Sequence, residues 1–412
     1  MRTLTWLGLG IVASLVVGGT AWGYPTVYPE GTTLLRGSNS AGFIFFPAAD
    51  GKVYLIKSVG TVLHTWQPAC GFNGAVRPLS DGHILLISCG GLVELDWDSQ
   101  VVWQAPAPAG CTFHHDLERL PNGHTVAWCQ QTVSAPALSD KPLVEDYLVE
   151  VSTGGSVVWE WHEIDHFDEF GFSQERKDLI FRLGGDFSHA NAVSAIPESS
   201  PLADPRFKPG NLIISLRHLN TIAVVDPVTD QIAWTLTDTT IGQHSTHMIP
   251  GGLPGAGRIL VFDNGYAQEW SLVTNRFFSR VLEIDPVAGT IPFTYTANMS
   301  TDPRRPGPLP MWSLFAPFIS GAQRQPNGNT LITEGPAGRL FEITPAGQLT
   351  WEYVIPYRGP TNNSNLSFRA YKVPFGFIGN HLLHPPPGSG SGEPATPAVE
   401  PDLPPEALFT GP

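Results

Sequence analysis

The chain has 412 residues, of which 42% are hydrophobic and 15% are charged, and it contains 43 glycines and 39 prolines. So few charges and so many turn-forming residues argue against a helical protein and favour an all-β protein of many short strands. The net charge of −14 is spread along the chain, which argues against nucleic acid as a partner. This length allows two or three domains, or one large propeller or barrel.

Residues 1–23 have the pattern of a secretory signal peptide. Arg2 precedes an apolar run from Leu4 to Val17, and small residues before Tyr24 offer a cleavage site. An uncleaved anchor is the alternative, since the run is almost long enough to span a bilayer. We expect a periplasmic or secreted protein with no membrane contact after cleavage.

Export favours disulfide bonds between the four cysteines, which are Cys70, Cys89, Cys111 and Cys129. A metal site is the alternative, but the chain has no Cys-x-x-Cys spacing. A mixture of bonded and free thiols is also possible. Cys111 and Cys129 fall on the first two strands of one repeating unit, so we expect them to pair with each other. The same argument pairs Cys70 with Cys89.

A hairpin motif returns six times along the chain. It consists of an apolar strand ending near Asp, Ser or Thr, a tight turn rich in Pro, Gly and Asp, and an apolar strand that ends in an aromatic residue. The copies span residues 53–66, 92–103, 148–159, 222–234, 281–293 and 340–351. We expect the terminal aromatic residues to pack between neighbouring units.

A turn followed by a strand precedes most copies of this hairpin, with Asp-Gly or Asn-Gly turns in the clearest cases. These segments begin near residues 79, 120, 209, 254 and 325. Each unit is therefore a four-stranded antiparallel sheet, and six units in series predict a six-bladed β-propeller spanning residues 24–384. Residues 367–374 could supply a closing strand to the first blade. The Pro- and Gly-rich residues 385–412 are predicted to be disordered.

Three of the predicted first strands carry a polar residue at an equivalent place. Counting back six residues from the turn proline of each segment reaches His115, Asn191 and His244. The first strand of each blade lines the central channel of a propeller, so these side chains are expected to meet there. His189 lies two residues before Asn191 and would face the same side of an extended strand.

Arg217 follows on the next strand of the same unit as His189. An arginine among histidines is a poor metal site but suits the oxygens of sulfate or phosphate, so we expect no metal and no cofactor. Asn191 and His247 are expected to contact the substrate, although His247 should point away from His244 if the strand is regular.

Four long segments between strands are expected to form a lid or wall around the pocket, namely residues 131–146, 162–185, 198–209 and 301–318. Their aromatic residues would either offer a flat apolar wall to a ring or pack the lid itself. These aromatic residues are Phe167, Phe170, Phe172, Trp312, Phe315 and Phe318.

Several of these runs together resemble the bacterial arylsulfate sulfotransferase family. They are residues 113–123, 186–191, 214–218, 243–244, 261–265, 320–331 and 368–371. The resemblance, which extends from about Gly42 to Pro374, implies a periplasmic six-bladed propeller. It implies transfer of a sulfuryl group from an aryl sulfate donor to a phenol acceptor, without a nucleotide donor and with a possible homodimer.

The resemblance also implies roles for individual residues. His244 corresponds to the histidine that is transiently sulfated. His115 and His189 correspond to its supporting histidines, and Arg217 to the arginine of the site.

Two other functions use the same residues. The first is a metal site built from histidines, with Asp116 and Asp186 as the nearby carboxylates; Arg217 argues against it. Its ligands would come from His114, His115, His189, His244 and His247. The second is a non-catalytic binding module.

Overall fold

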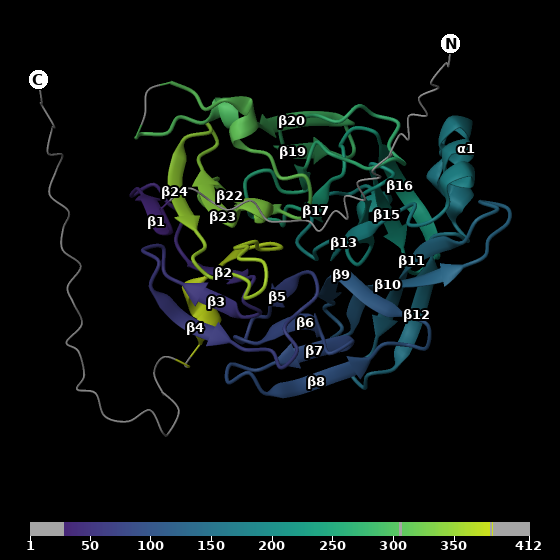
Figure 1. Cartoon of the computed structure of the whole chain (residues 1–412), viewed down its shortest axis with the longest axis horizontal. Coiled ribbons are helices and arrows are strands. Elements are labelled where there is room, and N and C mark those ends of the chain that lie inside the picture. Colours follow the sequence, from purple (N-terminus) through teal and green to yellow (C-terminus); the bar gives the residue numbers. More distant parts are fainter. Residues whose placement is uncertain (1–28, 305–306, 380, 382–412) are drawn as a thin grey trace, which may run out of the picture.

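The computed structural model describes residues 29–304, 307–379 and 381. The predicted signal peptide and C-terminal tail lie outside these residues. Within them, six antiparallel sheets are arranged in a ring around a central axis (Figure 1). The prediction of a six-bladed β-propeller with four-stranded blades is therefore confirmed.

The first three blades follow one another in the chain. Blade 1 contains β2 (Phe43–Pro47), β3 (Val53–Ile56), β4 (Val62–Trp66) and β25 (Tyr371–Val373). Blade 2 contains β5 (Val76–Pro78), β6 (Ile84–Ser88), β7 (Gly91–Leu95) and β8 (Val101–Pro106). Blade 3 contains β9 (Thr112–Arg119), β10 (Thr125–Val133), β11 (Leu143–Val151) and β12 (Val157–His162).

The last three blades complete the ring. Blade 4 contains β13 (Ala190–Ala195), β14 (Leu212–Leu216), β15 (Thr221–Asp226) and β16 (Gln231–Thr237). Blade 5 contains β17 (His244–Met248), β18 (Ile259–Asp263), β19 (Arg280–Asp285) and β20 (Thr290–Tyr295). Blade 6 contains β21 (Gly321–Arg324), β22 (Thr330–Glu334), β23 (Arg339–Ile343), β24 (Leu349–Val354) and, as a fifth strand, β1 (Gly31–Leu35).

Helices occur only in connections among the described residues. The α-helix α1 (Gln174–Leu183) lies on the outer rim of the ring (Figure 1). The short 3-10 helices are η1 (Phe167–Phe170), η2 (Pro205–Phe207), η3 (Ala297–Met299), η4 (Met311–Ser313), η5 (Gly335–Ala337) and η6 (Phe375–Ile378). Within the described ranges, no helix is long and apolar enough to cross a membrane.

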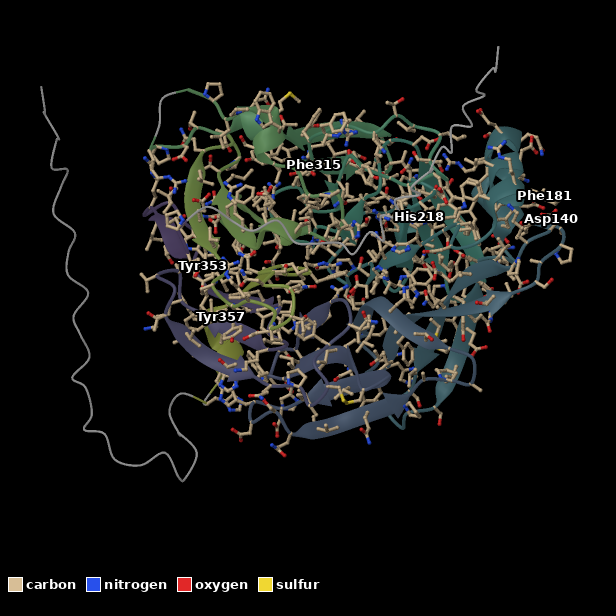
Figure 2. The ribbon with its side chains drawn as sticks, viewed as in Figure 1. Asp140, Phe181, His218, Phe315, Tyr353 and Tyr357 are labelled. Carbon is tan, nitrogen blue, oxygen red and sulfur yellow. A yellow bond between two sulfur atoms is a disulfide. The ribbon has the colours of Figure 1, made fainter. Side chains whose placement is uncertain are left out.

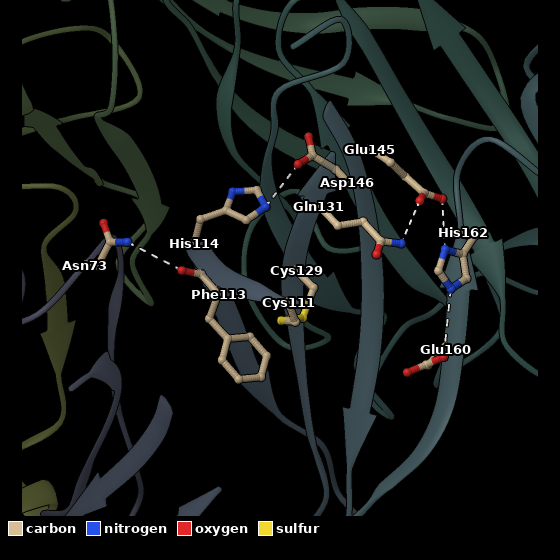
Figure 3. The surroundings of a disulfide bond; sticks show 10 residues. All are labelled: Asn73, Cys111, Phe113, His114, Cys129, Gln131, Glu145, Asp146, Glu160 and His162. Carbon is tan, nitrogen blue, oxygen red and sulfur yellow. Dashed lines mark hydrogen bonds and ion pairs between the residues drawn. A yellow bond between two sulfur atoms is a disulfide. The ribbon is translucent and has the colours of Figure 1, made fainter. Parts of the chain in front are cut away.

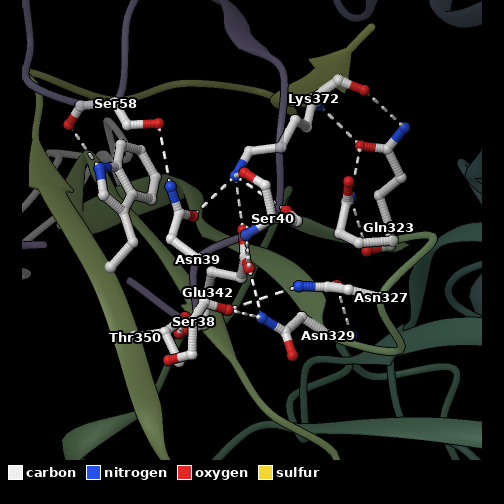
Figure 4. Close-up of polar contacts among 12 residues, drawn as sticks. Ser38, Asn39, Ser40, Ser58, Gln323, Asn327, Asn329, Glu342, Thr350 and Lys372 are labelled. Carbon is white, nitrogen blue, oxygen red and sulfur yellow. Dashed lines mark hydrogen bonds and ion pairs between the residues drawn. The ribbon is translucent and has the colours of Figure 1, made fainter. Parts of the chain in front are cut away.

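The ring is closed by both ends of the described chain. β25 pairs with β2, as expected for a closing strand in the first blade, and β1 pairs with β24 of blade 6. A buried ion pair joins the two blades, because Lys372 Nζ lies 2.6 Å from Glu342 Oε2 on β23. Ser40 contributes to the same network by accepting from Lys372 and donating to Glu342 (Figure 4).

The aromatic residues that end the outer strands pack against neighbouring blades, as predicted. Trp103 of blade 2 donates a hydrogen bond from Nε1 to Thr153 O in the outer turn of blade 3, at 2.9 Å. Trp351 of blade 6 makes the corresponding bond to Ser58 O in the outer turn of blade 1, at 2.7 Å. The same kind of contact thus recurs where blade 6 meets blade 1.

The four cysteines form two disulfide bonds, Cys70–Cys89 and Cys111–Cys129, as predicted. The second bond joins the residue just before β9 to β10, and these are the strands of blade 3 nearest the axis (Figure 3). Disulfides are typical of oxidising compartments outside the cytoplasm.

Candidate active site

Three innermost strands carry irregularities where the predicted site residues lie. The pairing of β9 with β10, β13 with β14 and β17 with β18 shifts register near the start of each inner strand. His115, His189 and Ser245 have φ values of 56°, 49° and 56°. Such left-handed backbone is uncommon for residues other than glycine, and each instance costs on the order of 1–3 kcal/mol. Bulges of this kind re-aim side chains next to functional sites.

A close backbone approach also positions His244. Gly242, two residues earlier, has a φ of +62°, and a Cβ atom there would lie 1.9 Å from Tyr266 O. Only glycine fits this position, because any side chain would collide with the backbone carbonyl of Tyr266.

A cavity of about 640 Å³ opens at this end of the channel. Its polar side brings together the four residues predicted to be catalytic, which are His115, His189, Arg217 and His244. Apart from Gln268, the rest of the lining is largely apolar and is formed by Tyr266, Phe277, Phe315, Pro317, Phe318 and Ile319. Phe181 on α1 lies at the outer edge of the ring, and His218 and Phe315 lie farther in (Figure 2).

The orientation of the His244 ring follows from its hydrogen bonds. Asn264, which follows β18, donates from Nδ2 to Ala316 O at 2.7 Å and Ile319 O at 2.9 Å. Its Oδ1 must therefore accept, and it lies 2.9 Å from His244 Nδ1. His244 thus carries its proton on Nδ1, and the Nε2 lone pair accepts from the Ile319 N–H at 3.1 Å.

Burial and neighbouring positive charge keep His244 neutral. Burial lowers the pKa of His244 well below its ordinary value, and the charge of Arg217 lowers it further. Burial also lowers the pKa of Arg217, to about 10, so the guanidinium stays charged at neutral pH. A neutral imidazole is a nucleophile, whereas an imidazolium is not.

His115 is linked to a second histidine and a carboxylate. Its Nδ1 lies 2.7 Å from His114 Nδ1, and His114 Nε2 lies 3.1 Å from Asp146 Oδ1 (Figure 3). Because Nδ1 is engaged, Nε2 is the nitrogen of His115 that remains for the cavity. Burial and the nearby His114 and His189 lower the pKa of His115 well below its ordinary value.

His189 is held by an acidic partner. Its Nδ1 lies 2.5 Å from Asp186 Oδ2, and its ring centroid lies 4.7 Å from that of His115. Asp146 fixes the backbone here, since its Oδ2 accepts from Ala190 N and Ser188 Oγ. Burial opposes ionisation of Asp186, but the His189 contact outweighs it and lowers the Asp186 pKa.

Arg217 is oriented by His218, the next residue in the chain. His218 Nδ1 donates to Asp186 O at 2.7 Å, so its Nε2 accepts from Arg217 Nη1 at 2.9 Å. Burial lowers the pKa of His218 to about 3, which keeps this acceptor neutral. Arg217 Nε is buried and has no hydrogen-bond partner among the described residues.

Two predicted substrate-binding residues do not line this cavity. Asn191 is fully buried on β13 and donates from Nδ2 to Gln243 O at 2.8 Å. His247 lies farther along β17 and lines a second cavity toward the other end of the channel. The substrate roles of Asn191 and His247 remain predictions.

The aromatic residues of the long segments divide into two groups. Phe315 and Phe318 line the cavity, as the wall interpretation expected. Phe167, Phe170 and Phe172 instead belong to a buried apolar cluster between blades 3 and 4, and Trp312 is 73% exposed.

Sequence reasoning had not assigned Asn264, His218, Tyr266 or Phe277 to the site. His218 had a local signal, because it follows Arg217 directly. Asn264 precedes a glycine after a strand, a pattern that also occurs in ordinary turns. Nothing in the sequence near Phe277 indicates that the connection between β18 and β19 reaches the cavity.

Three side chains beside the cavity could place ligand atoms around a metal ion. The ligand atoms of Asp186, His189 and His218 lie within 4.8 Å of one another. However, His218 Nδ1 is engaged by Asp186 O, and its Nε2 faces the charged Arg217. The positive charge of Arg217 beside this nitrogen disfavours the binding of a metal cation there. Of the five histidines predicted as metal ligands, only His189 belongs to this group of three described residues.

The fold and this cavity define a class of protein: a six-bladed β-propeller whose channel holds several histidines and one arginine beside an apolar wall. Residues 47–240 match the family model Arylsulfotransferase (ASST). The matched range includes His115, His189 and Arg217 and ends before His244. This match and the propeller fold together support an arylsulfotransferase-type function.

Solved structures are similar in fold. A protein of unknown function from Bacteroides caccae has 13% identity and a TM-score of 0.51, over 80% of this chain and 98% of that one. A catalytically inactive virginiamycin B lyase from Staphylococcus aureus, crystallised with quinupristin, has 11% identity and a TM-score of 0.40, over 80% and 90% of the two chains. The first likeness concerns the fold alone, and the second carries no argument. No curated protein matches the chain.

Proposed function

We propose that the protein transfers a sulfuryl group from an aryl sulfate to a phenol through a sulfated His244, without a nucleotide donor, in the periplasm or outside the cell. One observation carries the proposal: Asn264 fixes the proton of a neutral His244 on Nδ1, so that its Nε2 lone pair, which accepts from the Ile319 N–H, lies in the same cavity as Arg217. That pairing places a nucleophile beside a fixed positive charge.

In the first half of the reaction, His244 Nε2 attacks the sulfur atom and the bond from sulfur to the phenolic oxygen breaks. The Ile319 N–H marks the direction of this lone pair and must exchange its hydrogen bond for the incoming sulfur. By analogy with phosphoryl transfer, the transition state is loose and its charge spreads over the sulfuryl oxygens. Arg217 stabilises that charge, and its buried, unpartnered Nε–H is a further donor.

We propose that His189 supplies the proton that the leaving phenolic oxygen takes up. Asp186 accepts from His189 Nδ1, so a His189 that also carries a proton on Nε2 has its charge balanced. The leaving phenolate takes the Nε2 proton. In the second half, the acceptor phenol returns a proton to the same nitrogen while its oxygen attacks sulfur and the bond from sulfur to His244 breaks.

His115 and Asn191 have supporting roles in this proposal. His114 engages Nδ1 of His115, so in this proposal His115 turns Nε2 to the cavity and donates from it to a sulfuryl oxygen. Asn191 holds the Gln243 carbonyl immediately before His244, so we propose that it positions the nucleophile.

The apolar wall suits the ring of an aryl sulfate or a phenol. Tyr266, Phe277, Phe315 and Phe318 offer aromatic surface in the same cavity as the histidines. Phenols also suit the chemistry, because their pKa near about 10 makes phenolate a tolerable leaving group.

The test is an intact-mass measurement after incubation with 4-nitrophenyl sulfate and no acceptor. The protein should gain about 80 Da, the mass of SO₃, on His244, and should lose it when phenol is added. Turnover of the donor without this adduct, or turnover that follows added metal, would contradict the proposal. Lack of any turnover across aryl sulfates would favour a binding module.

A further inference from the structure

The channel contains a second cavity, of about 230 Å³, farther along the inner strands from His244. Each of the six blades contributes to its lining, so it lies on the propeller axis. Arginines gather on the side formed by blades 1, 2 and 6, where Arg369, Arg77 and Arg324 lie. The side formed by blades 4 and 5 is mostly apolar and includes Ala195, Pro197, Met248, Pro250 and Leu253.

The positive charges around this cavity are not fully balanced. Arg77 and Arg369 share one carboxylate, that of Asp116. Arg324 shares the carboxylate of Glu283 with Arg258, which lies outside the cavity lining. The remaining acidic group is Glu118, which lies 3.6 Å from Arg77. Four arginines thus face three carboxylates, and one positive charge lacks a counter-charge.

Two of these arginines also have hydrogen-bonding capacity left over. Arg324 and Arg369 are only 7% and 5% exposed, and the Nε–H of each is buried without a hydrogen-bond partner among the described residues. A buried donor on a charged group that lacks an acceptor is costly. A bound anion beside these guanidinium groups would supply the missing negative charge.

We propose that this second cavity binds a small organic carboxylate, with its charged end among Arg77, Arg324 and Arg369 and its apolar end against Met248 and Leu253. The planar guanidinium fork matches the two oxygens of a carboxylate. A monoanion matches the single uncompensated charge, and the apolar side favours an organic anion over inorganic sulfate. The proposal does not depend on the sulfuryl-transfer reaction.

The binding should strengthen as the pH falls. Burial raises the pKa of Glu118 to about 7, although Arg77 opposes this. Its other charged neighbours are Asp116 and Arg369, and His247 across the cavity is neutral because burial lowers its pKa to about 4. An incoming anion favours the protonated Glu118, so binding takes up a proton and gains affinity between pH 8 and pH 6.

The test is calorimetric titration of the full chain with benzoate, using benzamide as the uncharged ring control and sulfate as the inorganic control. Benzoate should bind, and benzamide and sulfate should bind at least about tenfold more weakly. Equal binding of benzamide would overturn the charge argument, and equal binding of sulfate would overturn the organic ligand.

Two arginines that share Glu283 give a matched pair of variants. Arg324→Met should weaken benzoate binding at least about tenfold, whereas Arg258→Met, which removes the same charge outside the cavity lining, should weaken it less than Arg324→Met does. Ala322→Leu, which narrows the cavity without altering a charge, should also weaken binding, so the test survives if Arg324→Met fails to fold. Arg217→Met should leave benzoate binding intact. Loss in Arg217→Met with retention in Arg324→Met and Ala322→Leu would place the ligand in the His244 cavity and overturn the proposal.

Discussion

The two ends of the channel are built from the same inner strands but are chemically different. At the start of these strands, His115, His189 and His244 surround Arg217 beside an aromatic wall. Farther along, arginines pair with buried carboxylates and only one histidine, His247, lines the cavity.

The difference shows how burial acts on different side chains. Burial lowers the pKa values of His115 and His244 and keeps both rings neutral, and the lone pair of the neutral His244 suits covalent chemistry. The arginines of the second cavity cannot be neutralised in this way, so they require counter-ions. One end is therefore suited to reaction and the other to binding a charge.

The largest expected effect separates two histidines on one strand. His244→Ala should reduce aryl sulfate turnover at least about 1,000-fold and abolish the sulfated species, because it removes the nucleophile. His247→Ala should stay within about threefold of wild type, since it lines the other cavity. Steady-state kinetics with a chromogenic aryl sulfate measures both. Equal losses of turnover in the two variants would contradict the proposal that reaction occurs only in the His244 cavity.

The next effect separates two arginines. Arg217→Met should lower kcat about 100- to 1,000-fold, the usual cost of removing a donor to developing charge. Arg324→Met should leave turnover within about threefold, because Arg324 serves the second cavity. A loss of turnover in Arg324→Met, with the fold intact by circular dichroism, would show that the two ends are coupled.

A smaller effect concerns the residue that positions His244. Asn264→Leu removes the acceptor at Nδ1 and should lower kcat about 10- to 100-fold, as expected for a lost orienting partner. The KM should change less than kcat, because the ring and its cavity remain. Asn365→Leu is the matched control, since Asn365 is equally buried but donates to Ile355 O in blade 6. If both variants lose activity equally, Asn264 contributes only stability.

The smallest effect is on the pH profile. Protonation of His244 would remove its lone pair, and its pKa is lowered well below the ordinary value, so kcat/KM should fall only at acidic pH. An unperturbed histidine, with a pKa of about 6.5, would already be half protonated at a pH of about 6.5. We expect kcat/KM to remain near its plateau from pH 8 to pH 6. An acidic limb centred at pH 6.5 or above would disagree with a buried nucleophile.

Much of the fold could be predicted because its signals are local. The hairpin with a terminal aromatic residue recurs within each blade, and its turns carry Pro, Gly and Asp. The turn prolines also set a common register, which placed His115, Asn191 and His244 on inner strands. Cys111 and Cys129 could be paired for the same reason, since they belong to adjacent strands of one blade.

The site depended on features that are not local. A regular strand would turn His189 and Asn191 to the same side, but a register shift between β13 and β14 separates them. The left-handed backbone of His115, His189 and Ser245 has no sequence signal, because these are not glycines. Asn264 could not be assigned, since its role depends on contacts with Ala316 and Ile319, more than fifty residues away.

The sequence by itself thus determined the number of blades, the pairing of the cysteines and the four side chains that gather around the first cavity. These follow from short-range periodicity, turn chemistry and the resemblance of a few motifs. Only the tertiary structure decided which nitrogen of His244 carries the proton, which residues form the aromatic wall and that His247 belongs to a separate cavity. Those properties arise where loops from different blades meet, and the bulges and buried charges there depend on neighbours distant in the chain.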